Sequence, residues 1–180
     1  IEAVKVWRWW PNPRLLEIGP GYGAFKAWLA QSSPEWSYYA ADSYPRIEGV
    51  EATELNGRLA ETTKARTHDV VVASNVFQHL SRAQRRAYYA DIARSLSKGG
   101  LFMVSSMVDC LGYSDPRRDS KGRQWCRHYG QLTEIQKHPA IATDLQEHFK
   151  VIQSSVRDNN WATFLCQKKA PQDPVTAPVI

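Results

Sequence analysis

A glycine-rich turn follows the first apolar run of the sequence, and it is the stretch best suited to hold a ligand. Residues 15–18 read Leu-Leu-Glu-Ile, and glycines follow at positions 19, 21 and 23. Glycine has no Cβ, so such a turn can bend sharply and approach a bound molecule closely. The pattern then becomes helical, and the unpaired N–H groups of a helix N-terminus point into the same crevice. These residues predict a cofactor site between a buried strand and a helix.

An acidic residue stands at the spacing expected for ribose recognition. Asp42 lies 23 residues after Gly19, near the roughly 20-residue spacing of a carboxylate that accepts hydrogen bonds from ribose hydroxyls. Gly19-x-Gly21-x-x-Ala24 also fits the dinucleotide fingerprint. The turn and Asp42 therefore indicate a nucleoside-containing cofactor without saying which one. A tight turn that binds no ligand is the plainer alternative.

Composition indicates an ordinary globular protein. The chain has 180 residues, of which 43% are hydrophobic and 23% charged, as expected for a single domain. No apolar stretch approaches the roughly 20 residues of a membrane span. A formal charge of +5 permits an anionic partner without requiring one. The first residue, Ile1, is not methionine, so we expect an excised or trimmed piece.

The cysteines do not predict a metal site or a disulfide framework. They are three, widely spaced, and no C-x-x-C or Cys/His cluster is present: Cys110, Cys126 and Cys166. We expect reduced thiols, a cytoplasmic location and no metal.

Short apolar runs alternate with helical patterns along most of the chain, which predicts a parallel α/β sheet. Strands are expected at 15–18, 36–42, 69–75 and 101–107, and as a terminal hairpin at 149–156 and 161–166 around the turn 158–160. The helix after the first strand should bury Phe25, Trp28 and Leu29.

A capping box, Ser81 with Gln84, opens a helix that should run to about Ser97 and end at Gly99-Gly100. The residues expected to face the core are Tyr88, Tyr89, Ile92, Ala93 and Leu96. Those expected to face solvent are Arg82, Arg85 and Arg86.

Three segments are harder to interpret. Residues 43–68 contain either a short strand, Val50–Leu55, or a helix, Glu51–Thr63, with Leu55 and Leu59 facing inward. Residues 108–130 have no clean periodicity and are expected to form a surface excursion. Residues 131–149 are predicted to be helical in two pieces, broken at Pro139.

The order of these motifs resembles one known family. The stretch reads Glu17-x-Gly19-x-Gly21-x-Gly23, residues 74–80 read Ser-Asn-Val-Phe-Gln-His-Leu, and residues 93–102 read Ala-Arg-Ser-Leu-Ser-Lys-Gly-Gly-Leu-Phe. Together with the terminal hairpin, these motifs resemble class I S-adenosylmethionine-dependent methyltransferases of the broad small-molecule type, over residues 14–168.

The resemblance implies a Rossmann-like α/β fold: a mostly parallel seven-stranded sheet with a C-terminal antiparallel hairpin and helices on both faces. It implies one cofactor-binding domain over residues 1–169. Within that domain, 1–13 is a lead-in arm and 108–130 a substrate lid, and 170–180 is a flexible tail.

The resemblance also implies roles for particular residues, with S-adenosyl-L-methionine as cofactor. Gly19, Gly21 and Gly23 would wrap the methionine part, and Glu17 would lie near its ammonium end. Asp42 would hold the ribose hydroxyls, while Ser74 and Asn75 would border the sulfonium and the acceptor. The 43–68 region lacks the usual Gly-Asp-containing motif, so the adenine contacts are not assigned.

Methyl transfer from a sulfonium is a direct displacement, which depends mainly on alignment and needs a base only if the acceptor loses a proton. An unshifted imidazole titrates near ~6.5, which makes His79 and His128 the candidate bases. His128 stands beside Tyr129 in the expected lid. His68, His138 and His148 are expected at surface or boundary positions.

The basic segment 113–129 carries five Lys or Arg against two Asp, a net of +3. Such a segment can receive a phosphate, a carboxylate or a nucleic-acid backbone, or it can be a solvated loop. The function expected first is methylation of an O, N or C atom of a small acceptor that can be anionic. The alternatives are an RNA or cap methyltransferase that uses this loop, a non-catalytic interaction domain that keeps the cofactor fold, and an NAD-type binder. The oligomeric state is not predicted.

Overall fold

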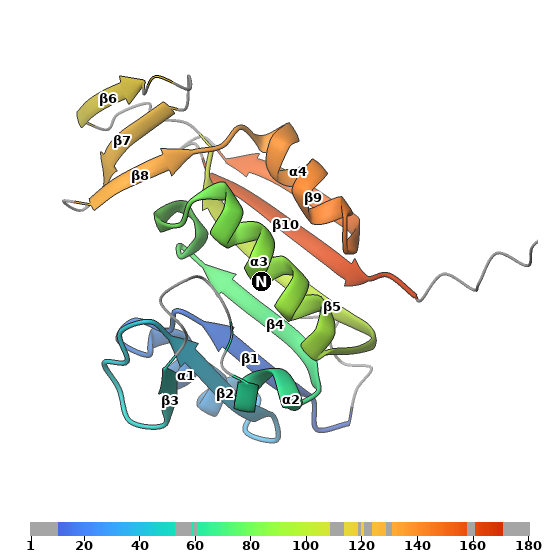
Figure 1. Ribbon diagram of the computed structural model, residues 1–180. Helices are drawn as coiled ribbons and strands as arrows, with labels where there is room; N and C mark the ends of the chain where they lie inside the picture. Colours follow the sequence, from blue (N-terminus) through green and yellow to red (C-terminus); the bar gives the residue numbers. More distant parts are fainter. Residues whose placement is uncertain are drawn as a thin grey trace, which may run out of the picture.

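A computed structural model describes residues 11–52, 59, 61–108, 114–118, 120, 124–128, 131–157 and 161–170. Its main sheet has seven strands in the order β3-β2-β1-β4-β5-β10-β9, and a small sheet has the order β6-β7-β8. The first five strands of the main sheet pair in parallel, whereas β10 is antiparallel to both of its neighbours (Figure 1). The predicted seven-stranded sheet and its terminal hairpin are confirmed.

The strands of the main sheet are β1 (Arg14–Ile18), β2 (Ser37–Asp42), β3 (Val50–Ala52), β4 (His68–Ser74), β5 (Leu96–Met107), β9 (Phe149–Arg157) and β10 (Trp161–Lys168). Those of the small sheet are β6 (Ser114–Arg118), β7 (Gln124–His128) and β8 (Gln131–Ile135). The helices are α1 (Ala24–Ser32), α2 (Glu61–Ala65), α3 (Arg82–Ser95) and α4 (His138–Gln146), with a 3₁₀ turn η2 (Phe77–His79).

Helices cover both faces of the main sheet, as expected. On one face, α3 and α4 pack Ile92 and Leu145 against Phe102 in the larger core cluster (Figure 1). On the other face, α1 packs Leu29 against Val70 in a smaller cluster. Because β4 is buried on both faces, its sequence is a continuous apolar run rather than an alternating one.

For residues 43–68, the structure answers the open question in part. Among the described residues of this region, Val50–Ala52 form the strand β3 and Glu61–Ala65 form the helix α2. Leu59 is buried, and its N–H donates to the buried Asp91 carboxylate of α3 at 3.1 Å. Leu55 lies outside the described residues, as do the arm 1–10, Tyr129, the turn 158–160 and the tail 171–180.

The predicted helix over 131–149 is wrong in its first part. Residues 131–135 form β8, which pairs antiparallel with β7, and the helix begins only at His138. Pro139 lies in the first turn of α4, where a missing N–H breaks no helical hydrogen bond. Within 108–130, β6 and β7 form the rest of the small sheet, beyond the carboxyl end of β5 (Figure 1).

The capping box of Ser81 and Gln84 is confirmed, but α3 ends earlier than expected. Leu96 is already extended, and Gly99 adopts its left-handed conformation inside β5. Arg85 is not on the wet face: it is 1% exposed and donates from Nη1 to the Phe77 carbonyl at 3.1 Å. Position 85 falls four residues before Tyr89, on the buried side of the helix.

The structure also differs from the predicted burial of Trp28 and from the predicted surface position of His68. Trp28 is 40% exposed and stacks on Phe25 with ring centroids 5.5 Å apart, so Leu29 is the buried residue of α1. His68 is fully buried rather than superficial, because it begins β4 beneath α3. His138 and His148 are half-buried, as expected.

A buried carboxylate ties α3, α4 and the end of β8 together. Asp144 accepts hydrogen bonds from Arg82 Nη2 and from Gln136 Nε2, both at 2.7 Å. We expect Asp144→Ala to lower the free energy of unfolding by about 2 kcal/mol, because the buried amide of Gln136 loses its acceptor. Denaturant unfolding measures this.

Glu147→Ala is the matched control, because it breaks an exposed pair with Arg86 between the same two helices. It should cost less than about 1 kcal/mol. Equal losses in the two variants would contradict the account.

Burial of His68 makes a second prediction. Burial, with the neighbouring cations Arg14 and Arg66, lowers the pKa of His68 to about 4. The unfolded state, with an ordinary pKa near ~6.5, therefore takes up a proton that the folded state does not, and stability falls between about pH 6.5 and 4 by up to about 3 kcal/mol. His68→Leu should flatten this part of the stability curve. Parallel curves for the two proteins would show that His68 does not titrate this way.

Candidate cofactor and acceptor site

The turn after β1 is built from three residues with positive φ. Gly19, Gly21 and Gly23 have φ of 70°, 56° and 80°, a region that favours glycine. The Gly19 N–H donates to the Ala41 carbonyl of β2 at 2.8 Å, which fixes the turn to the neighbouring strand. Gly23 is the N-cap of α1 and supplies no side-chain cap, so the first turn of the helix keeps its N–H groups available.

The three glycines face different surroundings. A Cβ on Gly19 would lie 2.3 Å from Val76 Cγ2, and a Cβ on Gly23 would lie 3.0 Å from Ile47 Cδ1. A Cβ on Gly21 would meet nothing within 4 Å. The missing Cβ atoms of Gly19 and Gly23 therefore leave room for the side chains of Val76 and Ile47, whereas Gly21 faces open space.

Glu17 stands just before the turn and is 6% exposed. Its Oε2 accepts a hydrogen bond from Tyr38 Oη of β2 at 2.5 Å. Burial raises the pKa of Glu17, and the bond from Tyr38 partly opposes this. A buried acid with a raised pKa at the end of a strand is typical of a functional site.

Asp42 ends β2 beside the glycine turn, because Ala41 pairs with Ile18 of β1. The carboxylate accepts the Tyr44 N–H at 2.9 Å through Oδ1, which fixes its direction. Glu17 and Asp42 therefore come from the carboxyl ends of adjacent parallel strands, as the sequence predicted.

Ser74 and Asn75 follow at the carboxyl end of β4, on the other side of β1. Asn75 has a φ of 60°, and its N–H and Oδ1 both lie 3.3 Å from Ser105 Oγ of β5. The Ser74 and Ser105 hydroxyls are 3.1 Å apart. Ser105 was missed by sequence reasoning, although a serine pair near the end of an apolar strand was a signal that could have found it.

The candidate bases approach this edge from two elements. His79 ends η2 and is exposed, with its Nε2 3.3 Å from Gln78 Nε2. His128 ends β7, where its Cα is paired with that of Gln131. The small sheet contacts η2, which carries His79, through β8.

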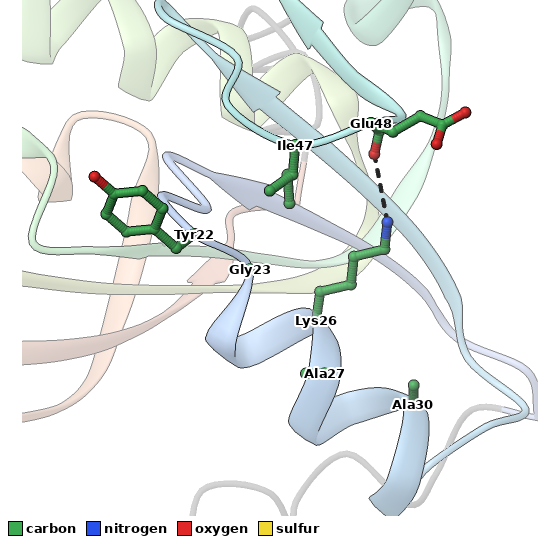
Figure 2. Close-up of a pocket in the computed structure, with 7 residues that line it drawn as sticks. All are labelled: Tyr22, Gly23, Lys26, Ala27, Ala30, Ile47 and Glu48. Carbon is green, nitrogen blue, oxygen red and sulfur yellow. Dashed lines mark hydrogen bonds between the residues drawn. The ribbon is translucent and has the colours of Figure 1, made fainter.

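A cavity of about 360 Å³ adjoins the glycine turn, because Tyr22 and Gly23 are among its lining residues (Figure 2). Ala27 and Ala30 line it from α1, and Ile47 and Glu48 line it from the loop opposite. Lys26 Nζ donates across it to the Glu48 carbonyl at 3.5 Å (Figure 2).

No group of three or more His, Cys, Asp or Glu within the described ranges could hold a metal ion. In that same part of the chain, no helix is both long and apolar enough to cross a membrane.

Comparison with known proteins shows what the chain resembles. Residues 16–102, which include β1, the glycine turn, Asp42, β4 and α3, match the methyltransferase domain family. The match covers a little under half of the chain, and over that part the chain is similar to methyltransferase domains.

Solved structures confirm the fold of this chain. A protein from Pyrococcus horikoshii OT3 is similar with a TM-score of 0.73 and 14% identity, over 93% of this chain and 87% of that one. An S-adenosylmethionine-dependent methyltransferase from Clostridium acetobutylicum ATCC 824 is similar with a TM-score of 0.68 and 12% identity, over 88% of this chain and 85% of that one.

A third similar structure is the 1,6-didemethyltoxoflavin-N1-methyltransferase of Burkholderia thailandensis, with bound 1,6-didemethyltoxoflavin and S-adenosylhomocysteine. Its TM-score is 0.64 and its identity 15%, over 88% of this chain and 72% of that one. No curated protein matches this chain in sequence.

The packing of Val76 on Gly19 makes a testable prediction. Gly19→Ala should destabilise the protein by about 2–4 kcal/mol, because it combines a clash with a positive φ. Gly21→Ala should cost only about 1 kcal/mol, because its Cβ enters open space. Unfolding of the Gly19→Ala/Val76→Ala double variant should show partial rescue. A strictly additive loss would contradict the contact.

Proposed function

We propose that this enzyme transfers a methyl group from S-adenosylmethionine to an O, N or C atom of a small acceptor that can be anionic. The observation that carries the proposal is the arrangement of Gly21 between two acids, Glu17 and Asp42, with Ser74 and Asn75 on the next strand. In this proposal, residues 1–169 form one domain and 108–130 contributes the lid.

Each polar group has a role in binding. Asp42 would accept hydrogen bonds from the ribose hydroxyls, for which its fixed carboxylate suits the geometry. Glu17 would accept from the ammonium end, and the backbone of Gly19–Gly23 would contact the methionine part. When bound, the cofactor supplies an electrophilic methyl carbon. Ser74 and Asn75, held by Ser105, would border that carbon and the acceptor.

The chain contributes alignment more than acid–base chemistry. Holding the acceptor about 3 Å from the methyl carbon and in line with the breaking bond can supply several kcal/mol. For an acceptor that loses a proton, His128 or His79 would take it, with Tyr129 nearby in sequence. These assignments rest on the small sheet lying next to η2.

An anionic acceptor is supported by the strand pairing of the lid region. Arg117 and Arg118 on β6 pair with Trp125 and Gln124 on β7, and the Cα of Arg127 is paired with that of Ser114. Three cationic residues therefore come from one pair of strands. The same charges make RNA the second candidate acceptor, which a salt-dependent gel shift would detect.

Calorimetry with S-adenosylhomocysteine tests the cofactor site. We expect Glu17→Gln and Asp42→Asn each to weaken binding about tenfold, through the loss of a charge-assisted hydrogen bond. With 5′-methylthioadenosine, which has the ribose but no ammonium group, only Asp42→Asn should weaken binding.

Glu147→Gln is the matched control, because this carboxylate pairs with Arg86 of α3 and is not part of the glycine turn or of the cavity beside it. Its binding should equal that of the wild-type enzyme. Failure of the wild-type enzyme to bind either ligand, or displacement of the bound ligand by NAD, would contradict the proposed function.

A further inference from the structure

Tyr38 contacts the buried acid at the cofactor edge of the sheet. Its hydroxyl donates to Glu17 Oε2 at 2.5 Å, from near the start of β2 to near the end of β1. Within the part of the chain that the structure describes, it is the one hydrogen-bond partner of that carboxylate. The second oxygen, Oε1, therefore has no protein donor there.

The phenol ring is held in place from the helix side. Tyr38 packs on the smaller core cluster with Phe25 and Leu29 of α1. Lys26 Nζ lies 5.8 Å from the ring centroid and is itself tied to the Glu48 carbonyl (Figure 2). A ring fixed on two sides presents its hydroxyl to Glu17 with little freedom to rotate away.

The charged and titratable groups that face Glu17 are few. From β2 there is Tyr38, and from α1 there is the Lys26 ammonium on the far side of that ring. From β4 the paired residue is Val72, which is apolar. Burial raises the pKa of Glu17, and the Tyr38 bond acts against it.

Tyr38 is a permanent donor in this position. Burial and the adjacent carboxylate raise the pKa of Tyr38 well above its usual range, so the phenol stays protonated at any physiological pH. A donor that cannot ionise stabilises the charged form of its acceptor. The interaction therefore favours a carboxylate over a carboxylic acid at Glu17.

We propose that Tyr38 is a positioning residue for cofactor binding, which keeps Glu17 ionised and directs its second oxygen toward the ammonium group of the methionine part. This inference rests on the proposed function, because it requires Glu17 to receive that ammonium. It assigns Tyr38 a role in affinity rather than only in packing.

Tyr38→Phe removes the hydroxyl and keeps the ring. Without the donor, the pKa of Glu17 should rise further, so the carboxylate is lost at a higher pH. Tyr38→Phe should therefore bind S-adenosylhomocysteine more weakly than the wild type, by about tenfold where the loss is greatest, and the affinity should recover toward that of the wild type as the pH is raised. Calorimetry at a series of pH values measures the shift.

A second ligand separates this role from damage to the fold. 5′-Methylthioadenosine has no ammonium group, so Tyr38→Phe should bind it as the wild-type enzyme does at every pH. Glu17→Gln supplies a second variant: it should remove the pH step, and adding Tyr38→Phe to it should change the affinity for S-adenosylhomocysteine no further.

Tyr39→Phe is the matched control. It makes the same change one residue along β2, on the opposite face, where the ring meets His68 at 5.6 Å. Its affinity and pH profile should match those of the wild-type enzyme.

The inference is overturned if the pH profile of Tyr38→Phe superposes on that of the wild type, if the loss is equal at every pH, or if 5′-methylthioadenosine binding falls as well. If the wild-type enzyme bound neither ligand, the proposed function itself would fail and this inference with it. The two failures are therefore distinguishable.

Discussion

The site depends on the close approach of the loop after β4 to the turn after β1. Val76 occupies the space where a side chain on residue 19 would begin, so glycine at that position permits the contact. Parallel pairing of β1 with β2 and with β4 brings three carboxyl ends to one edge of the sheet. Ligands of open α/β sheets bind at such an edge. The acids, the turn and Asn75 take their relative positions from these contacts.

Electrostatics at this edge centres on a buried acid, Glu17, with a single protein hydrogen-bond donor among the described residues. Burying Glu17 disfavours its charged form, and the single phenol donor from Tyr38 only partly opposes that cost. Such an arrangement is poor for stability, since a better-paired or apolar residue would pack there more favourably. It suits a residue whose remaining oxygen accepts from a cationic ligand. Asp42, by contrast, is half-exposed and is held in direction by a backbone N–H.

Local sequence signals predicted much of the fold because several elements carry their own determinants. The apolar run of β4 and the capping box that opens α3 depend on residues close in sequence. Residues 131–135 form a strand only because they pair with β7, and no local pattern shows that partner. The burial of Arg85 likewise depends on the Phe77 carbonyl, eight residues away in a different element.

In the candidate site, too, local patterns predicted some residues, whereas others depend on contacts between strands. Spacing to the glycines predicted Asp42 and the family resemblance predicted Glu17. The contacts of Tyr38 and Ser105, by contrast, depend on cross-strand register, which periodicity does not give. The measurement that tests the account most directly is a crystal structure with S-adenosylhomocysteine. It should show the ribose hydroxyls on Asp42 and the ammonium group at Glu17 Oε1, over an open Gly21. No ligand density at Gly21, Glu17 and Asp42, with the crevice closed by Val76 and its neighbours, would contradict it.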